Sequence, residues 1–92
     1  MNGYKNTETY YASLWLDTSN ATHAEVIRMA MAAEGLTEED ALRQVADALR
    51  EFVEGRAPTL SGLYADLMDN ALESIDYYTL AREYMEEIKP CK

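Results

Sequence analysis

The chain has 92 residues, a net charge of −9, and a composition in which 48% of the residues are hydrophobic. A chain of this length forms one domain, and its four glycines and two prolines argue against a disordered or turn-rich β protein. The negative charge repels phosphate groups, so direct binding to nucleic acid or to an anionic membrane is disfavoured.

The opening stretch NTETYYASLWLD gathers Tyr10, Tyr11 and Trp15 close together. We expect Asn6 or Thr7 to cap a short helix here, because the stretch lacks the clean alternation that a strand requires. A strand is the alternative, since aromatic residues also suit one. We expect the aromatic side chains to cover the core, with an interface cluster as the competing interpretation.

The stretch NATHAEVIRMAMAAEG predicts a second helix, capped by Asn20 or Thr22 and ended by Gly35. Glu25, three residues after Thr22, completes the pattern of a capping box. The apolar side of this helix is expected to hold Val26, Ile27, Ala30 and Met31.

A third helix is predicted over residues 38–54. Thr37 is the expected cap, and the three acidic residues that follow it favour the positive end of a helix dipole. Gly55 is expected to end the helix. Its apolar series contains Leu42, Val45, Leu49, Phe52 and Val53.

The most regular pattern of the chain covers residues 60–75, where apolar residues recur every three or four positions. This pattern predicts a fourth helix, although Gly62 lies within it. Asp76 is the expected cap of a fifth helix, whose apolar stripe runs from Tyr77 through Leu80 to Ile88. Residues 1–92 are therefore expected to form a single α-helical domain, an all-α compact bundle of about five short helices.

Few residues are suited to catalysis. His23 is the only histidine, and Cys91 the only cysteine, so neither a nucleophilic triad nor a metal cluster can be assembled from them. No glycine-rich loop is present to bind phosphate. We expect a protein that is not an enzyme and that uses no metal or cofactor. The absence of a secretory pattern and of a long apolar run predicts a cytoplasmic location.

The placement of charge is more informative than its amount. The sequence has no lysine or arginine between Ala57 and Ala81, and its acidic residues there recur at helical spacing. A single helix presents one charge per ~4–5 Å, against one per ~1.7 Å in duplex DNA, so a nucleic-acid mimic needs a second acidic helix alongside. An ordinary solvated face is the alternative interpretation. The residues expected to form the binding surface are Asp66, Asp69, Glu73, Asp76, Glu83 and Glu87, with Tyr11 and Tyr78 as anchors.

Both ends of the chain resemble a family of small, largely uncharacterised proteins of phages, plasmids and their hosts. The matching opening positions run from Asn6 through Trp15 to Asn20, in an Asn-x-Glu-Thr-aromatic segment followed by Leu-Trp-Leu. Near the other end, Ile75 and Asp76 begin a similar Ile-Asp-aromatic segment. The resemblance implies a small helical protein of mobile elements, located in the host cell cytoplasm, and transfers no catalytic residue.

Together these features predict a non-enzymatic protein-binding module. The favoured interpretation is an acidic inhibitor of a host defence complex, such as an anti-CRISPR or anti-restriction protein, that occupies a basic nucleic-acid-binding surface on a host protein. The alternative is a structural or assembly protein that acts as a homodimer. A helix-turn-helix regulator is disfavoured, because the element at residues 63–84 carries Arg82 as its one arginine among acids.

Overall fold

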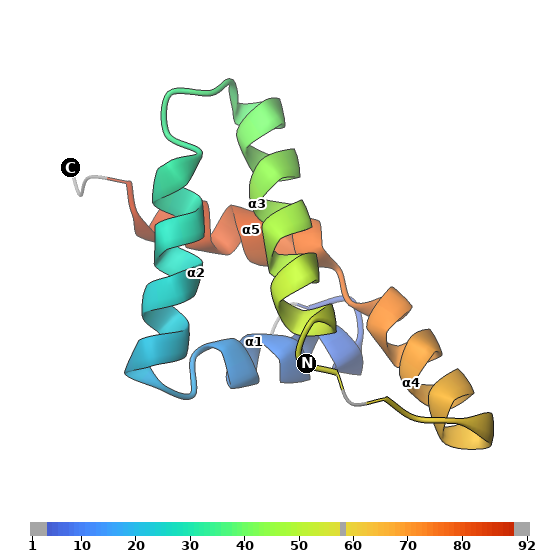
Figure 1. Ribbon diagram of the computed structural model, residues 1–92. Helices are drawn as coiled ribbons and strands as arrows, with labels where there is room; N and C mark the ends of the chain where they lie inside the picture. Colours follow the sequence, from blue (N-terminus) through green and yellow to red (C-terminus); the bar gives the residue numbers. More distant parts are fainter. Residues whose placement is uncertain (1–3, 58, 90–92) are drawn as a thin grey trace.

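The computed structural model describes residues 4–57 and 59–89, which form five α-helices and no β-strand (Figure 1). The predicted fold class, an all-α bundle of about five short helices, is confirmed. The predicted helix over residues 60–75 begins later than expected, at Gly62, whose φ of 63° favours glycine. In chain order the helices are α1 (Thr7–Leu16), α2 (Asn20–Ala32), α3 (Glu38–Glu54), α4 (Gly62–Ser74) and α5 (Tyr77–Glu87).

Short polar side chains cap four of the five helices. The predicted cap of α2 is wrong, because Ser19 precedes Asn20 and accepts a hydrogen bond from the Thr22 N–H at 3.1 Å. Ser61 precedes α4 without a side-chain cap bond, so this helix begins without that stabilisation. Three predicted caps are confirmed, each accepting from the backbone N–H three residues on: Asn6, Thr37 and Asp76.

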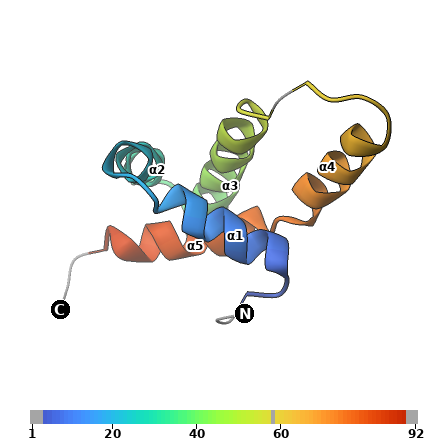
Figure 2. The same ribbon diagram turned by 90° about the horizontal axis from the view of Figure 1, so that it is seen from below.

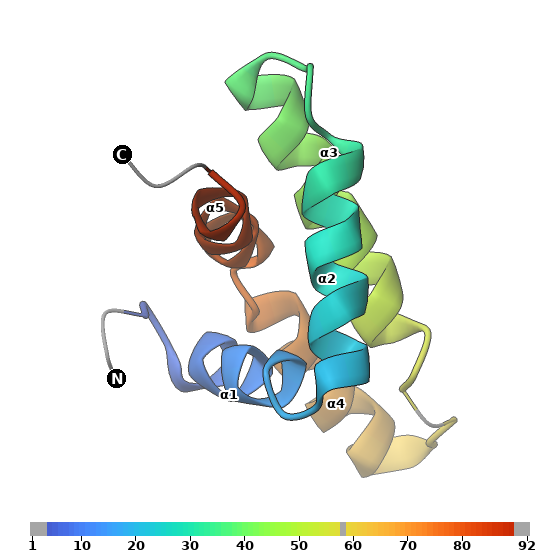
Figure 3. The same ribbon diagram turned by 90° about the vertical axis from the view of Figure 1, so that its left-hand side faces the viewer.

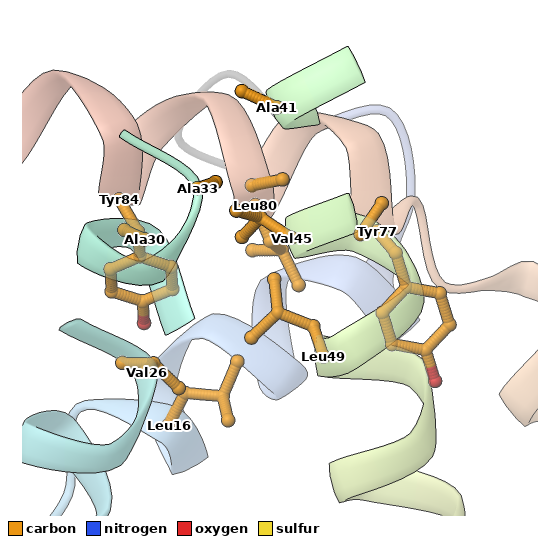
Figure 4. Packing of buried hydrophobic residues seen from close by; sticks show 12 residues of the cluster. Leu16, Val26, Ala30, Ala33, Ala41, Val45, Leu49, Tyr77, Leu80 and Tyr84 are labelled. Atoms are coloured by element: carbon orange, nitrogen blue, oxygen red, sulfur yellow. The ribbon is translucent and has the colours of Figure 1, made fainter. Parts of the chain in front are cut away.

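The core lies where α5 crosses the antiparallel pair α2 and α3 (Figures 1 and 3). Side chains from these three helices and from the end of α1 meet there and are almost completely excluded from water (Figure 4). Full burial of one large aliphatic side chain stabilises a fold by roughly 1.5–3 kcal/mol. The largest aliphatic side chains of this core are Leu16, Val26, Val45, Leu49 and Leu80.

The buried faces agree with the sequence pattern in α3 and α5, and in α2 they agree at Val26, Ile27 and Ala30 and differ at Met31. Val45 and Leu49 of α3 are fully buried, as predicted. Met31 is exposed, because the stripe of α2 that meets the core runs through Val26 and Ala30 and leaves Met31 to one side. The stripe of α5 is buried at Tyr77, Leu80, Ala81 and Tyr84.

The orientation of α1 contradicts, for Tyr11 and Trp15, the expectation that its aromatic side chains cover the core, whereas Tyr10 is partly buried. Tyr11 is 62% exposed and Trp15 is 43% exposed. The helix instead buries Thr9, Ser13 and Leu16. Two of these three side chains are polar, so hydrophobicity alone does not explain which side of α1 faces inward.

The link between α4 and α5 supplies the reason. Buried backbone groups require hydrogen-bond partners, and the link lies against the beginning of α1. The hydroxyl of Thr9 accepts from the Asp76 N–H at 2.8 Å, and the side-chain amide of Asn6 donates to the Ser74 carbonyl at 2.6 Å. The polar side of α1 therefore faces the link, and its aromatic side is left outside.

The fourth helix projects from the other four (Figures 1 and 2). None of its residues is buried, and its packing contacts are chiefly with α1. The molecule measures 49 × 26 × 25 Å and has a radius of gyration of 13.8 Å. A compact chain of this length has a radius of gyration of about 12 Å. The bundle is therefore elongated, and the apolar side of α4 is only partly covered.

Candidate protein-binding surface

Three of the predicted binding residues form an acidic face on α4: Asp66, Asp69 and Glu73. All three are exposed, and their spacing of three and four residues places them on successive turns. Within the part of the chain that the structure describes, no ion pair joins any of them to a basic group. Glu73 lines a pocket with Lys5 and Arg50 and interacts electrostatically with Arg50, so Asp66 and Asp69 are the acids of this face that lie outside that pocket. The acidic face is open to a positively charged surface chiefly through these two residues.

Asp76, the fourth acid of the predicted stripe, has a structural role. It is half-buried and caps α5, accepting from the Thr79 N–H at 3.2 Å and from the Thr79 hydroxyl at 2.7 Å. Burial by itself raises the pKa of this carboxyl, but the hydrogen bonds from Thr79 and the nearby charge of Lys5 outweigh burial and lower the pKa below 3.8. The charge of Asp76 is therefore stabilised by groups of the same chain, so Asp76 serves the fold and does not extend the acidic face.

The two acids of α5 also lie apart from the acidic face. Glu83 accepts a hydrogen bond from the Tyr4 hydroxyl at 2.7 Å, and Glu87 lies 2.7 Å from Nε2 of His23 on α2. Figure 1 shows α5 continuing away from the end of α4 across the core, and not beside α4. The second acidic helix that a nucleic-acid mimic needs alongside α4 is therefore not supplied by α5.

The two predicted tyrosine anchors occupy different places. Tyr11 lies on the outer side of α1, with its ring centroid 5.6 Å from that of Tyr10. Tyr78 is half-exposed at the start of α5, where it lines a pocket of about 440 Å³ together with Lys5 and Arg50. Basic and acidic groups mix around that pocket. Of the two tyrosines, Tyr11 lines the apolar groove between α1 and α4.

An apolar groove runs between α1, the end of α3 and α4, with a volume of about 350 Å³. Among the described residues, Glu8 is its only charged lining residue, and no lysine or arginine of residues 4–57 and 59–89 lines it. At one end, the Trp15 ring lies 6.1 Å from that of Phe52, which is covered in turn by the guanidinium of Arg56. We call this feature the α1–α4 groove; its lining includes Tyr11, Ala12 and Trp15 of α1, Val53 of α3, and Met68, Ala71 and Leu72 of α4.

Beside the groove, α4 and the segment just before it carry an apolar strip that points into water. Its members are all more than two-fifths exposed, and Tyr64 and Leu63 reach 69% and 68%. Tyr64 and Leu67 lie one turn from the groove residues Met68 and Ala71, so the strip continues the groove outward. The apolar strip consists of Leu60, Leu63, Tyr64 and Leu67.

The helical periodicity separates three surfaces of α4. At about 100° per residue, the groove residues and the apolar strip are centred roughly 90° apart and overlap at Tyr64, while the acidic face is centred roughly 130–140° from each of them. A partner that lies in the groove and on the strip therefore leaves the acidic face beside it, on the far side of α4. The acidic residues then act on the partner mainly through their electrostatic field.

Sequence reasoning missed this groove, although the sequence contains a signal for it. The apolar residues of 60–75 are spread over about half of the circumference of the helix, from Leu63 round to Leu72. One packing neighbour covers a narrower stripe, so part of such a face must remain exposed or await a partner. The exposed aromatic side chains of α1 form the opposite wall and were expected in the core.

The remaining polar pairs connect helices to one another. The Tyr84 hydroxyl donates to Asp17 at 2.8 Å, and burial together with this carboxylate raises the pKa of Tyr84. The buried hydroxyl of Tyr77 has no hydrogen-bond partner in the described residues. Within residues 4–57 and 59–89, no group of three or more His, Cys, Asp or Glu side chains is arranged to hold a metal ion. Cys91 lies outside the described residues.

In the described part of the chain, no helix has both the length and the apolar character needed to span a bilayer. Comparison with protein-family models, with curated proteins and with solved structures gives no significant match. The resemblance to small phage and plasmid proteins therefore stays a prediction based on the two ends of the chain.

Proposed function

We propose that this protein is a non-enzymatic protein-binding module whose partner presents a basic surface. The observation that carries the proposal is the acidic face of α4, where Asp66, Asp69 and Glu73 are exposed and make no ion pair with a basic group in the described residues. A net charge of −9 extends the same field over the molecule. Fields of this kind steer oppositely charged partners and raise association rates.

Within this class, the resemblance to proteins of mobile elements favours an inhibitor of a host defence complex, of the anti-CRISPR or anti-restriction kind. Its action would be to occupy a basic surface that otherwise binds nucleic acid. Three carboxylates on one helix are too sparse to imitate a duplex charge for charge. The acidic face therefore serves to attract and orient the partner, while apolar side chains supply the lasting contacts.

Kinetics with the captured partner test this proposal. A host protein is first captured with the wild-type chain. The rate at which it associates with the wild-type chain and with the double variant Asp69→Lys, Glu73→Lys is then measured across a range of salt concentrations. The association rate at low salt is expected to fall about tenfold or more, and its dependence on salt to become shallower.

The matched control reverses two exposed acids elsewhere, Glu34→Lys and Glu51→Lys, with the same change in net charge. At physiological salt the control is expected to keep the association rate within about threefold of wild type, because Debye screening then limits charge effects to roughly 8 Å; the two variants are compared at that ionic strength. Equal rates for the wild-type chain and the α4 variant would refute the role of the acidic face.

A second candidate function is a homodimeric assembly protein, which the apolar strip favours. Leu63, Tyr64 and Leu67 are more exposed than a lone soluble domain requires, and a second copy would cover them. Sedimentation over a wide concentration range decides between the candidates. A dimer that dissociates on dilution, with a melting temperature that follows concentration, would favour assembly; a monomer at all concentrations would exclude it.

A further inference from the structure

The α1–α4 groove and the apolar strip form one unfilled apolar surface. Its walls come from Tyr11 and Trp15 on one side and from the side chains of α4 on the other. Six exposed aromatic and leucine side chains, each leaving on the order of 100 Å² in water, expose roughly 600 Å². This approaches the ~800 Å² that one partner contributes to a standard protein interface, and it lies at the upper end of the roughly 300–600 Å² that the largest apolar patch of a typical monomer covers.

The shape of this surface fits a helix. Side chains from two turns of α1 and two turns of α4 line the groove, and Val53 adds a contact from the end of α3, so its lining follows two helices over a length of about two turns each. Grooves of this kind receive amphipathic helices, which insert apolar side chains at positions i, i+3, i+4 and i+7. A volume of about 350 Å³ accommodates two or three side chains of the size of leucine.

The charge around the groove selects the kind of helix. Glu8 lies in the groove and no basic residue of the described part of the chain lines it, while the acidic face of α4 lies just beyond its wall. Arg56, at one end, is stacked on Phe52. A second copy of this chain would bring its own acidic α4 and its charge of −9 against the same charges, which opposes self-association. A helix with lysine or arginine on its flanks is attracted by Glu8 and by the acidic face, whereas Arg56 disfavours a basic group at its own end of the groove.

From these features we infer that the α1–α4 groove binds the apolar face of a basic amphipathic helix of the partner protein. This inference rests on the proposed function and adds to it a docking site and a recognised structure. The groove side chains make the desolvated contacts, Glu8 meets a basic flank of the incoming helix, and the acidic face attracts that helix from a distance.

A designed peptide tests the inference directly. The probe is an 18-residue peptide of leucine and lysine, with leucine at helical spacing, and it contains no tryptophan. Trp15 is the only tryptophan of the chain and lines the groove, so its emission reports occupation of that site. Saturable binding with a blue shift of the Trp15 emission is expected, together with at least tenfold weaker binding of a scrambled peptide of the same composition.

Two variants locate the site. Ala71→Lys places a long charged side chain in the groove, on a helix that contributes no buried residue, and is expected to weaken peptide binding at least tenfold. Ala32→Lys, the same substitution at an exposed position of α2, is the matched control and is expected to bind as wild type. Circular dichroism and thermal melting confirm that both variants fold.

The outcomes separate this inference from the proposed function. Equal binding of the ordered and scrambled peptides, or unchanged binding by Ala71→Lys, would overturn the groove as the docking site while leaving attraction by the acidic face in place. Equal binding of a leucine and glutamate peptide would overturn the preference for a basic helix. A dimer of the free protein that Ala71→Lys dissociates would show that a second copy occupies the groove, and would also overturn the inference.

Discussion

Helices α4 and α5 are neighbours in the sequence and similar in length, yet they lie in opposite environments. The fifth helix buries four residues in the core, including Leu80, while the fourth buries none. Both have an apolar side and an acidic side. The difference is that α5 crosses α2 and α3, whereas α4 has only α1 and the edge of α3 beside it. An apolar helix face therefore predicts a contact without showing whether the same chain supplies it.

This contrast separates two tasks within a small protein. Burial around α5 supplies most of the hydrophobic free energy of folding, because it removes whole side chains from water. The apolar face of α4 is still largely hydrated, so its transfer free energy remains available for binding. The first region is expected to govern stability, and the second is proposed to govern recognition.

The largest expected effect compares one leucine from each region. Leu80→Ala removes a fully buried side chain and is expected to lower the free energy of unfolding by about 2–5 kcal/mol. Leu63→Ala, at a position that is 68% exposed, is expected to change it by less than ~0.5 kcal/mol. Urea unfolding followed by circular dichroism measures both. Similar losses for the two variants would mean that α4 is packed as tightly as α5.

Much of the fold is predictable from the sequence because helix signals are local. Periodicity and caps such as Thr37 and Asp76 depend on residues within one or two turns, and five helices follow from them. The placement of helices depends on contacts between distant residues, which such signals do not contain. Trp15 is exposed because its helix turns Thr9 toward a link nearly 70 positions away in the chain.

The candidate surface was only partly predictable for the same reason. Asp66, Asp69 and Glu73 share one helix, so their common face follows from spacing alone. The expectation that Glu83 and Glu87 join them required knowledge of how α5 crosses the bundle. The groove was missed because its walls belong to three helices, and no local pattern shows that they leave a gap.

The second prediction concerns the joint that fixes α1 against the link between α4 and α5. Thr9→Val retains the shape of the side chain but removes the acceptor of the buried hydrogen bond from the Asp76 N–H. An unsatisfied buried donor costs about 1–3 kcal/mol in the free energy of unfolding. Thr18→Val removes a hydroxyl that donates to the Leu14 carbonyl at an exposed position, and is expected to cost less than ~0.5 kcal/mol. Equal losses would show that the Thr9 hydrogen bond does not stabilise the joint.

The smallest expected effect is a pH dependence at the boundary between α4 and α5. Asp76→Asn keeps an N-cap acceptor for the Thr79 N–H but removes the charge that favours the positive end of α5. At pH 7 the variant is expected to be less stable than wild type by under ~1 kcal/mol.

The sign of this pH dependence follows from the lowered pKa of Asp76. Hydrogen bonds from Thr79 favour the ionised carboxylate in the folded state, so the unfolded chain takes up the proton first as the solution is acidified. The stability that the ionised group contributes is complete above about pH 5, and is lost as the pH falls through 3.8 and then through the lower pKa of the folded state. Chemical unfolding of both proteins from pH 7 down to the most acidic condition at which they fold should therefore show the two stabilities converging.

Asp66→Asn, which removes an exposed charge on α4, serves as the control at pH 7 and is expected to stay within ~0.5 kcal/mol of wild type. A wild-type advantage over Asp76→Asn that persists or grows in acid would show that the carboxylate is not stabilised by its cap, and that α5 is held in place by burial alone.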